Sequence, residues 1–516
     1  MNRRYFFFGS VLAGAVPAAG FGSVPSLRAL GYKPFYDKLN VAAIGCGGQG
    51  GVILNNAAAT ENIVALCDVD EKRAAANYQK YSKQPKYKDF RVMLDKEGKN
   101  IDAVTIGIPD HMHATVALNA MQRGKHVYVE KPLTRTVWEA RLLRDAAAKY
   151  KVASQMGNQG YSHEAIRTTA EIIWSGAIGD VKEVHASSTP GTHPTGLTAP
   201  PPEASVPGNV DWDLWLGSAN MRAFSPDYVP YNWRGFFDFG TGQLGNWGIH
   251  SLGPVNLALQ LGAPVSVELL TQENQSKWTF PSKAVIRYDF PQRGGLPPVS
   301  VFWHDSSRSD APDAYRVPGA ENELVLPRSG NLSEKGRGAA GGRPGGGGGG
   351  FGRPGGPGGP GGGGARPAGG RRIGAGGPDV AVYGSQDPLP PPKPGILSGN
   401  GAVFVGSKGL LSTVERGEGV KLLPEDKWKD YTLPSQVLTR SPGHMADWVR
   451  ACKGGDMSCS DFSISVPYVE WVLLGVIAFR VPGKLMWDGK AGRFTNSEEA
   501  NKLLKPIFRR GWELKL

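Results

Sequence analysis

The chain of 516 residues is long enough for roughly two or three domains, and its apolar content of 40% favours ordinary globular cores over a disordered chain. Its formal net charge is +12, but residues 336–377 hold six arginines and no acid, and residues 1–30 hold three arginines and no acid. The rest of the chain therefore carries a formal charge of only +3. Such a small excess requires no basic face, so we predict no nucleic-acid partner.

The amino-terminal segment has the pattern of an export signal. Arg3 and Arg4 precede an apolar run, rich in Gly and Ala, that reaches about Gly22. Paired arginines before such a run are typical of a twin-arginine signal, which we place within residues 1–30. The run is about 14 residues long, shorter than the roughly 20 that a membrane-spanning helix needs. We therefore expect a periplasmic or secreted protein without a stable membrane anchor.

The stretch LNVAAIGCGGQG, residues 39–50, is an apolar run that ends in the pattern G-x-G-x-x-G and continues into a helical pattern. This is the pattern of the dinucleotide-binding turn, in which each glycine has a separate steric role. Gly45 allows the tight turn, Gly47 lets the backbone approach a pyrophosphate, and Gly50 lets helix and strand pack closely. Amides at the start of the helix would bind the phosphates. The predicted phosphate-binding residues are Gly45, Gly47, Gly48, Gln49 and Gly50.

A second apolar run, residues 62–68, ends in Asp68, about 18 residues after Gly50. A carboxylate at this place accepts hydrogen bonds from the adenosine ribose hydroxyls. It also repels a 2′-phosphate, so the sequence predicts NAD as the cofactor, with NADP less favoured.

From residue 40 to about residue 158, short apolar runs alternate with helical patterns, as in parallel strands joined by crossover helices. The predicted strands are residues 40–45, 62–68, 101–108, 126–130 and 152–157, and the predicted helices are residues 71–81, 112–123 and 136–150. We assign residues 38–160 to a doubly wound Rossmann domain, whose ligands lie at the carboxyl ends of its strands. Two of those strand ends are polar, Pro109-Asp110-His111 and Glu130-Lys131-Pro132.

Residues 161–516 mix helical and strand patterns and predict an α+β domain. Its predicted strands are residues 180–189, 265–270, 283–289, 298–304, 402–415 and 484–487, and its predicted helices are residues 163–175, 441–452 and 466–480. Residues 336–377 contain 24 glycines and no apolar periodicity. Because such a segment cannot bury enough surface to offset its backbone entropy, we expect a disordered insertion at about residues 328–395.

Aromatic residues crowd the stretch that ends at Trp247. They are Trp212, Trp215, Phe224, Tyr228, Tyr231, Trp233, Phe236, Phe237 and Phe239. Aromatic faces pack on the C–H faces of sugar rings, and Asn232 or Arg234 could bind the sugar hydroxyls. Ordinary core packing explains the same residues equally well, so both interpretations stay open at this point.

Four cysteines are too few for a disulfide scaffold in a chain of this length. Cys452 and Cys459 are close enough in the sequence to pair after export, and two free thiols are an equal alternative. His111 and His113 are the nearest approach to a metal-binding pair, but no further ligand has suitable spacing, so we predict no metal.

The motifs AIGCGGQG, CDVD, IPDHMHA and EKPLT follow one another at suitable separations. Together with NWRGFFDFGTGQLGNWGIH and SPGHMADWVRACKGG, they make the chain resemble the Gfo/Idh/MocA oxidoreductases over nearly its whole length, apart from about residues 306–396. The resemblance implies a Rossmann domain followed by a larger domain built on an open, mostly antiparallel sheet. That sheet would cover the nicotinamide, and it often serves in oligomer contacts, so we expect a homo-oligomer.

The resemblance places Lys131 beside the nicotinamide and the substrate hydroxyl. There the ammonium would stabilise the negative charge that develops as a hydride leaves. His250 is the natural base, because an unperturbed pKa of about 6.5 leaves imidazole neutral but basic. The family usually has an aspartate four residues before this histidine, where this chain has Asn246. An amide cannot share the proton or strengthen the basicity of the imidazole, which puts efficient simple dehydrogenation in doubt.

The site residues form three overlapping sets. The predicted catalytic residues are Lys131, Asn246 and His250. Beyond the glycine turn and Asp68, the predicted cofactor contacts are Pro109, Asp110, His111, Glu130, Lys131, Asn158 and Gln159. The predicted substrate contacts are Lys131, Trp233, Arg234, Asn246 and His250.

These residues predict an NAD(P)-dependent oxidoreductase that acts on a hydroxyl of a carbohydrate or other polyol. One open alternative is a glycosidase or lyase that oxidises a sugar carbon transiently, because residues 250–255, HSLGPV, resemble NAD-dependent glycosidases of the same superfamily. Another is a non-catalytic sugar-binding protein, which Asn246 makes conceivable. Because an exported enzyme cannot draw on the cytoplasmic NAD pool, we expect tightly held NAD and a closed cycle in which the same hydride leaves and returns.

Overall fold

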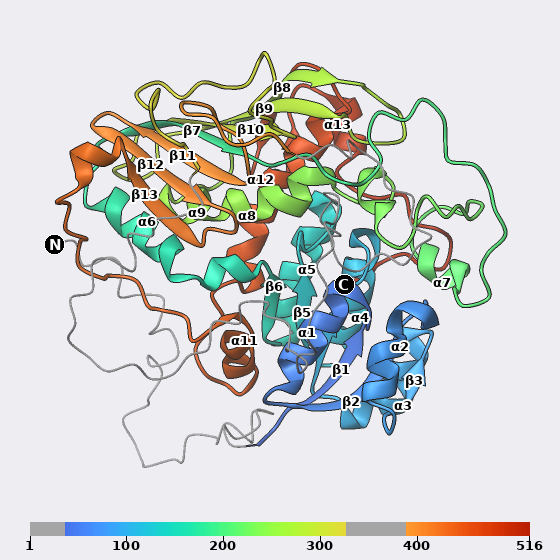
Figure 1. Ribbon diagram of the computed structural model, residues 1–516. Coiled ribbons are helices and arrows are strands. Elements are labelled where there is room, and N and C mark those ends of the chain that lie inside the picture. Colours follow the sequence, from blue (N-terminus) through green and yellow to red (C-terminus); the bar gives the residue numbers. More distant parts are fainter. Residues whose placement is uncertain (1–36, 327–388) are drawn as a thin grey trace, which may run out of the picture.

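The computed structural model describes residues 37–326 and 389–516 (Figure 1). The predicted export signal and most of the predicted disordered insertion lie outside the described residues. The last part of that insertion, residues 389–395, is described. The amide of Gly395 donates to the carbonyl of Glu323 at 2.9 Å, and its carbonyl accepts from the amide of Val317 at 2.8 Å. This end is therefore hydrogen bonded to the segment that precedes the insertion.

The first part of the described chain folds around a sheet of six parallel strands in the order β3-β2-β1-β4-β5-β6. The strands are β1 (Asn40–Ile44), β2 (Asn62–Cys67), β3 (Lys86–Tyr87), β4 (Ala103–Ile106), β5 (His126–Glu130) and β6 (Ser154–Gly157). This is the Rossmann strand order, so the predicted doubly wound parallel sheet is confirmed. β3 is absent from the predicted set, because a strand of two residues is too short to carry a periodic pattern.

Helices on both faces connect these strands. They are α1 (Gly48–Ala58), α2 (Glu71–Lys80), α3 (Phe90–Glu97), α4 (Asp110–Gln122) and α5 (Val137–Tyr150), and a 3-10 helix, Gly98–Asn100, follows α3. Side-chain caps set some of their starts. Asp70 accepts from the amide of Arg73 at α2, and Thr136 forms a capping box with Glu139 at α5.

The second sheet, called the large sheet below, has nine strands in the order β13-β12-β11-β7-β10-β9-β8-β14-β15. They are β7 (Val181–Ser187), β8 (Ser266–Glu273), β9 (Lys283–Phe290), β10 (Val299–Asp305), β11 (Gly401–Gly406), β12 (Gly409–Val414), β13 (Gly419–Leu423), β14 (Lys484–Asp488) and β15 (Arg493–Phe494). β7 and β10 run parallel, and the other neighbours pair antiparallel. The mostly antiparallel sheet implied by the family resemblance is thus confirmed. Along β9 every second residue is buried, as in a sheet with one face on a core.

Shorter elements complete the second part. Its helices include α6 (Glu164–Trp174), α7 (Trp212–Leu216), α8 (Ile249–Ser251), α9 (Gly253–Ala258), α11 (His444–Cys452), α12 (Phe462–Ala478) and α13 (Glu498–Lys502). The 3-10 helices are Gln159–Ser162, Asn232–Gly235 and Glu425–Trp428, and Leu244–Gly248 is a π-helix. Figure 1 shows α6 and α9 beside the large sheet and α11 beside the Rossmann domain.

The predicted strand at residues 402–415 is a hairpin, β11 and β12, which reverses at Ser407 and Lys408. Each arm has a continuous run of buried residues, so only the Gly-Ser-Lys-Gly break marks the reversal in the sequence. The unpredicted β13 then extends the sheet by one antiparallel strand. The turn between β12 and β13, residues 415–418, packs against Gly160, at the edge of the Rossmann domain.

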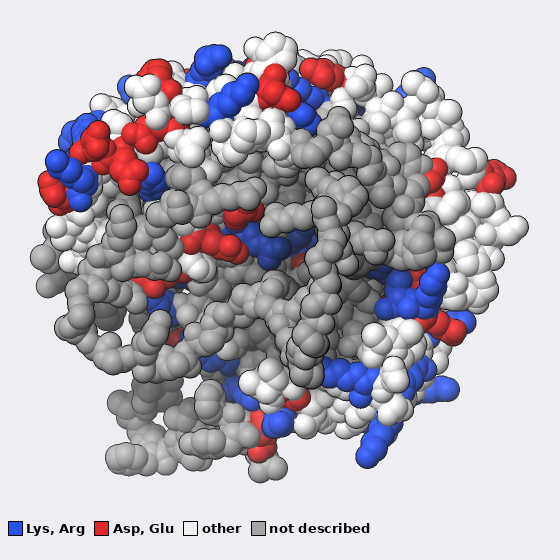
Figure 2. Space-filling model, viewed as in Figure 1, with Lys and Arg blue, Asp and Glu red and all other residues white. Residues whose placement is uncertain are grey.

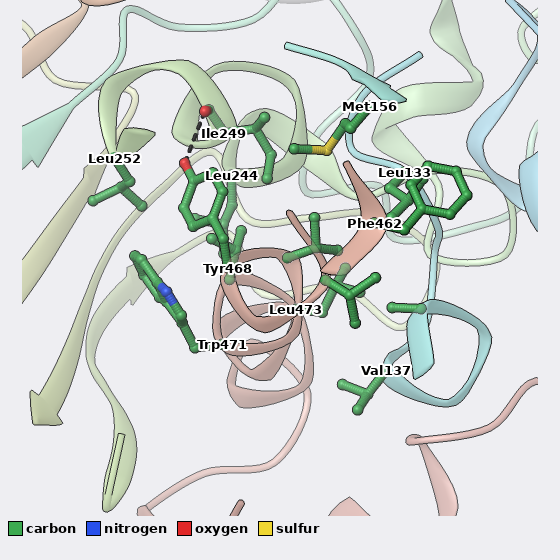
Figure 3. Close-up of a cluster of buried hydrophobic side chains, with 14 of the residues drawn as sticks. Leu133, Val137, Met156, Leu244, Ile249, Leu252, Phe462, Tyr468, Trp471 and Leu473 are labelled. Carbon is green, nitrogen blue, oxygen red and sulfur yellow. Dashed lines mark hydrogen bonds between the residues drawn. The ribbon is translucent and has the colours of Figure 1, made fainter. Parts of the chain in front are cut away.

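α12 is the helix that joins the two sheets, because it contacts α5 and β6 of the Rossmann domain and β8 of the large sheet. Most of its residues are buried, as expected of a helix that is apolar on all sides. Figure 3 shows its side chains among buried residues of both domains, with Leu133, Val137 and Met156 from one and Leu244, Ile249 and Leu252 from the other. Within the described ranges, no helix is long and apolar enough to cross a membrane.

A smaller apolar cluster covers part of the large sheet. Val317, Leu326 and Leu397 lie on the two chain segments that flank the undescribed stretch, and they pack with Val403 of β11 and Leu410 of β12. These segments bury apolar side chains that an open sheet would leave exposed.

Candidate active site

The glycine turn after β1 is packed too tightly for side chains. A Cβ on Gly45 would lie 2.2 Å from the carbonyl oxygen of Gly107, and Gly45 has a φ of +86°. A Cβ on Gly50 would lie 2.4 Å from the carbonyl oxygen of Gly45 and 2.7 Å from that of Gly107. α1 therefore lies directly against the ends of β1 and β4, with its amino-terminal amides at the carboxyl edge of the sheet.

Gly47 and Gly48 face Arg73 of α2. A Cβ on Gly47 would lie 2.7 Å from the carbonyl oxygen of Arg73, and one on Gly48 would lie 2.6 Å from a guanidinium nitrogen of the same residue. The backbone of Arg73 thus leaves no room for a side chain at Gly47, which is a second reason for glycine there besides the predicted approach to a pyrophosphate. The guanidinium adds positive charge beside the amides of α1, where phosphates would bind.

Asp68, just beyond β2, holds the glycine turn. Its Oδ2 accepts from the amide of Cys46 at 2.7 Å, and its Oδ1 accepts from the amide of Asp70 at 2.9 Å. Burial raises the pKa of this carboxyl group, and the two amide bonds act in the opposite direction. Each oxygen keeps a lone pair, so these bonds leave room for the predicted bond to a ribose hydroxyl.

Glu130 ends β5 and is tied to the helix of the glycine turn. Its Oε1 accepts from Nε2 of Gln49 at 3.2 Å and from Nε2 of Gln159 at 2.6 Å. Gln159 also donates to the hydroxyl of Tyr128 at 3.1 Å. These bonds bring together three of the predicted cofactor segments: the start of α1, the end of β5 and the turn after β6.

Asn158 lies in the turn after β6 and is 1% exposed. Its Oδ1 accepts from the hydroxyl of Ser460 at 2.6 Å, while its Nδ2 has no hydrogen-bond partner in the described chain. A buried amide donor without a partner costs free energy. The Nδ2 of Asn158 is therefore a candidate donor to a bound ligand.

Lys131 follows β5, and its ammonium is held by Asn246. The Nζ of Lys131 donates to Oδ1 of Asn246 at 2.5 Å and to the backbone carbonyl of the same residue at 2.8 Å. Nδ2 of Asn246 donates to Oε1 of Gln243 at 3.0 Å, and Nε2 of Gln243 donates to the carbonyl of Thr189 at 2.7 Å. This chain of amides keeps the side-chain oxygen of Asn246 directed at Lys131.

Burial lowers the pKa of Lys131 to about 7, and the charge of Arg234 contributes in the same direction. The carboxyl groups of Glu130 and Asp110 act in the opposite direction without cancelling the effect of burial. Burial likewise raises the pKa of these two carboxyl groups. An amine with a pKa near neutrality can both take and give a proton under ordinary conditions.

His250 lies in α8, just beyond the π-helix, and is 4% exposed. Its ring packs against that of Trp247 with ring centres 5.8 Å apart, and its Nδ1 has no hydrogen-bond partner in the described chain. Burial, together with the charges of Lys131 and Arg416, holds the pKa of His250 well below its usual value. The expected pKa of about 6.5 is therefore wrong for this site, and His250 is a weaker base than the sequence predicts.

Asn246 and His250 do not form the pair that a regular helix predicts. The side-chain hydrogen bonds of Asn246 go to Lys131 and Gln243. The chain between Leu244 and Gly248 is π-helical, and the wider turn changes the spacing of the side chains on each face. Single π-helical turns are frequent at functional sites.

α12 supports this π-helical segment. The hydroxyl of Tyr468 donates to the carbonyl of Ile249 at 2.7 Å and to that of Gly248 at 3.2 Å, and Figure 3 shows the side chain directed at Ile249. Tyr468 is itself 1% exposed. α12 thus fixes the backbone just before His250.

Pro109 precedes α4, and Asp110 lies in its first turn. Oδ2 of Asp110 accepts from the hydroxyl of Thr241 at 2.7 Å, on the side that also bears the charges of Arg234 and Lys131. The side chain of His111 lies elsewhere. Its Nε2 is 3.0 Å from the carbonyl oxygen of Trp215, and its ring lies against the rings of Trp215 and Phe239. His111 therefore packs with the aromatic residues, although it is predicted to line the cofactor side of the cleft.

Seven of the nine predicted aromatic residues form a buried cluster, whereas Phe237 packs in the main core and Tyr231 is 37% exposed. The members of the cluster are Trp212, Trp215, Phe224, Tyr228, Trp233, Phe236 and Phe239. Core packing, one of the two open interpretations, therefore describes these side chains. Trp233, a predicted substrate contact, is 4% exposed, and the guanidinium carbon of Arg234 lies 4.2 Å from the centre of its ring. Arg234 is half-buried, and it is the member of this predicted pair that faces the site.

The four cysteines are free thiols in the structure. Cys452 and Cys459 are thus not joined, and Sγ of Cys459 lies 3.1 Å from the hydroxyl of Ser162. Among the described residues, no group of three or more His, Cys, Asp or Glu side chains is placed to hold a metal ion.

Three residues near Lys131 are missing from the predicted site. Gln243 precedes Asn246 by three residues, a helical spacing that could have suggested their contact. Thr241 has no such signal. Arg416 has no sequence signal either, because only the fold of the large sheet brings its turn to Trp247. Its guanidinium carbon lies 6.0 Å from the centre of the Trp247 ring.

The residues of this site fit a bound NAD. The glycine turn presents bare backbone at the amino end of α1, and Asp68 keeps free lone pairs beside it. At the other end, Nδ2 of Asn158 and Nδ1 of His250 are buried without partners in the described chain. Together, the fold and the site define an NAD-binding protein built on a Rossmann domain.

Comparison with known families gives the same result. Residues 39–158 match the Gfo/Idh/MocA family model described as "Oxidoreductase family, NAD-binding Rossmann fold". Residues 166–291 match the family model described as "Oxidoreductase family, C-terminal alpha/beta domain". Residues 39–158 and 166–291 thus belong to the Gfo/Idh/MocA family of oxidoreductases.

Its relatives include enzymes of two kinds. A glycosyl hydrolase family 109 protein from Solibacter usitatus is 28% identical over 184 residues, which cover 33% of this chain and 41% of that protein. An inositol 2-dehydrogenase from Salmonella typhimurium is 31% identical over 149 residues, which cover 28% of this chain and 42% of that protein. The chain thus spans less than half the length of either curated relative.

Solved structures share the fold. The WlbA dehydrogenase from Chromobactrium violaceum, in complex with NADH and UDP-GlcNAcA, is similar with a TM-score of 0.52 and 14% identity. The similarity covers 88% of this chain and 98% of that one. At this identity the likeness establishes the common architecture and nothing more specific.

Proposed function

We propose that the protein is an NAD-dependent oxidoreductase that acts on a hydroxyl group of a sugar or other polyol. The observation that carries the proposal is Lys131, which burial brings to a pKa of about 7 and which Asn246 holds at the carboxyl edge of the Rossmann sheet. Oxidation of a carbinol requires a group that takes the hydroxyl proton as the hydride leaves. The similarity to an inositol 2-dehydrogenase supports the substrate class.

In this proposal, neutral Lys131 takes the hydroxyl proton, and the two oxygens of Asn246 stabilise the resulting ammonium. His250 stays neutral because its pKa is lowered by burial, and its Nδ1 orients the substrate hydroxyl. Bound NAD supplies the hydride acceptor. These roles differ from the predicted ones, in which His250 takes the proton and Lys131 remains charged.

The test is turnover of a panel of neutral and acidic sugars and cyclic polyols by the full-length, NAD-loaded protein, followed by NADH absorbance. Lys131→Met should lower turnover by about 100-fold or more, because the proton acceptor is lost, while NAD affinity changes little. Lys149→Met, at an exposed position of α5, is the matched control and should behave as wild type. Normal turnover by Lys131→Met would sink the proposal.

A second candidate is a glycosidase or lyase that oxidises a sugar carbon transiently. The similarity to the glycosyl hydrolase family 109 protein favours it, as does the resemblance of residues 250–255 to NAD-dependent glycosidases. Oxidation acidifies the neighbouring C–H, so elimination can follow, and the hydride returns after water adds. In heavy water, deuterium at that carbon together with aglycone release and no net NADH supports this candidate. Net NADH without deuterium entry supports simple dehydrogenation.

We also propose export by the twin-arginine route, with NAD held tightly through a closed cycle. The support is the Arg3-Arg4 motif, which lies outside the described residues, and the lack of an NAD supply beyond the cytoplasm. Periplasmic protein should therefore stay active after a desalting column without added nucleotide. Activity that returns only on addition of NAD contradicts the proposal, and so does unprocessed protein found solely in the cytoplasm.

The homo-oligomer expected from the family resemblance is a further proposal. Leu270 of β8 and Met486 of β14 expose 44% and 38% of their surface on the large sheet, which supports a contact there. Light scattering after size exclusion should give a multiple of the chain mass, and Leu270→Glu with Met486→Glu should reduce it. Val437→Glu, at an exposed loop position, is the control. A monomeric wild-type protein contradicts the proposal.

A further inference from the structure

Arg416 is placed in the site by its backbone. It lies in the turn between β12 and β13, outside the residues that the family models match. A Cβ on Gly160 would lie 2.0 Å from the carbonyl oxygen of Arg416, so the turn rests directly on the residue after Gln159. Gly417 has a φ of +79°, and a Cβ there would lie 2.7 Å from Ile166 of α6 and 2.9 Å from Pro254 of α9. The position of the turn is therefore set by contacts on both sides of Arg416.

The side chain of Arg416 faces the groups assigned to the chemistry. Its guanidinium carbon lies 6.0 Å from the ring centre of Trp247, and that ring packs on His250. Burial is the main cause of the lowered pKa of His250 and of Lys131, and the charge of Arg416 contributes to both. Figure 2 shows basic and acidic side chains next to one another at the centre of the face, near the place of α8 and β6 in Figure 1.

Arg416 has no ion-pair partner within residues 37–326 and 389–516. The neighbouring Glu415 is held by Asn400, whose Nδ2 donates to its Oε2 at 3.2 Å. Among the buried acids of the site, Glu130 is hydrogen bonded by Gln49 and Gln159. The guanidinium thus brings to the substrate side of the site a positive charge that forms no ion pair with a described carboxylate.

A neutral polyol would leave this guanidinium without an ion-pair partner. A bound ligand displaces water from the guanidinium, and a buried charge without a counter-charge costs free energy. A carboxylate removes that cost, because its two oxygens match the planar fork of arginine. Arg234 is a second positive charge near Lys131, and its guanidinium carbon lies 4.3 Å and 4.2 Å from the ring centres of Tyr231 and Trp233, on which it packs.

We propose that Arg416 binds a carboxylate group of the substrate, so that the hydroxyl to be oxidised belongs to a sugar acid. The half-buried Trp247 lies between Arg416 and His250 and would pack on the C–H face of the sugar ring. This inference rests on the proposed function, because it concerns the substrate of the same site.

The test measures binding by calorimetry, with the full-length, NAD-loaded protein. The probes are D-glucuronate, D-galacturonate and D-glucuronamide, the last of which keeps the shape of the acid and loses its charge. The acids should bind about 10- to 100-fold more tightly than the amide, as expected of a charge-assisted bidentate pair. Arg416→Gln should remove most of this preference while NAD affinity and amide binding change little.

Two further variants control the result. Arg416→Lys keeps the charge and loses the planar fork, so part of the preference for the acid should remain. If circular dichroism shows that Arg416→Gln does not fold, the binding of acid and amide is compared between Arg416→Lys and the wild type instead. Lys421→Gln removes a charge from β13 of the same hairpin, where Lys421 pairs with Glu425, and should keep the full preference.

Equal binding of acid and amide by the wild type overturns the inference, as does a preference that survives in folded Arg416→Gln. Tighter binding of glucose 6-phosphate than of glucuronate, dependent on Arg416, supports an anion site and overturns its assignment to a carboxylate. Because the readout is binding, an acid preference that depends on Arg416 supports the inference even where no sugar is oxidised. In that case only the proposed function fails.

Discussion

The Nζ of Lys131 is held by both oxygens of Asn246, the side-chain Oδ1 at 2.5 Å and the backbone carbonyl at 2.8 Å. At the position where the family resemblance implies an aspartate, this chain thus sets a neutral oxygen against the lysine. A carboxylate would favour the ammonium and raise its pKa, whereas an amide leaves burial to lower that pKa to about 7. The departure from the family pattern therefore concerns the lysine more than the histidine.

Asn246→Asp should move the pH dependence of turnover to higher pH. In the wild type we expect turnover to rise with pH to about 7 and then level off, because the neutral form of Lys131 takes the proton. The added carboxylate stabilises the ammonium, so the rise should move up by about one pH unit or more. Initial rates at saturating NAD, across a series of buffers, measure this shift. If wild-type turnover instead falls as pH passes through neutrality, Lys131 acts as a cation and not as the base.

Asp68→Ser should narrow the preference for NAD over NADP. The wild type should bind NAD about tenfold or more tightly than NADP, because the Asp68 carboxylate repels a 2′-phosphate. A serine removes the charge, and Arg73 beside the glycine turn can then attract the phosphate. Titration of each cofactor, followed by tryptophan fluorescence, measures both affinities. Tighter binding of NADP by the wild type would contradict the role given to Asp68.

Gly50→Ala should weaken NAD binding and destabilise the fold by about 1–3 kcal/mol, as overpacking does. The added methyl group would lie 2.4 Å and 2.7 Å from two backbone carbonyl oxygens, which cannot move away as a flexible side chain can. Gly98→Ala is the matched control, because a Cβ there meets nothing within 4 Å. Thermal unfolding and NAD titration of both variants provide the comparison, and equal behaviour of the two would show that the close approach of α1 is unimportant.

Tyr468→Phe should lower stability by about 1–3 kcal/mol and also lower turnover, because two buried carbonyls at the end of the π-helix lose their donor. Tyr288→Phe is the control: its hydroxyl donates to the carbonyl of Val472 on the same helix, away from Asn246. We expect the control to lose stability while keeping its turnover. Denaturant unfolding and kcat measure the two effects, and equal loss of turnover in both variants would mean that the effect is global.

The sequence by itself determined the Rossmann half and the strand ends at which its candidate site residues lie. The strand β5 has the predicted range, and the glycine turn, Asp68 and Lys131 lie at the strand ends where they were expected. These features are local: the apolar runs, the steric need for glycine at Gly45 and Gly50, and the polar residue that ends a buried strand can each be seen within a few residues.

Only the tertiary structure decided which side chains contact one another in the site and how burial shifts their pKa values. Asn246 contacts Lys131 across 115 positions of sequence, and Arg416 reaches Gly160 through a hairpin of the other domain. The lowered pKa of His250 and the turning of His111 into the aromatic cluster depend on burial, which is a property of the packed chain. Residue types and periods describe the near neighbours of a side chain, whereas desolvation and charge at a site come from every element packed around it.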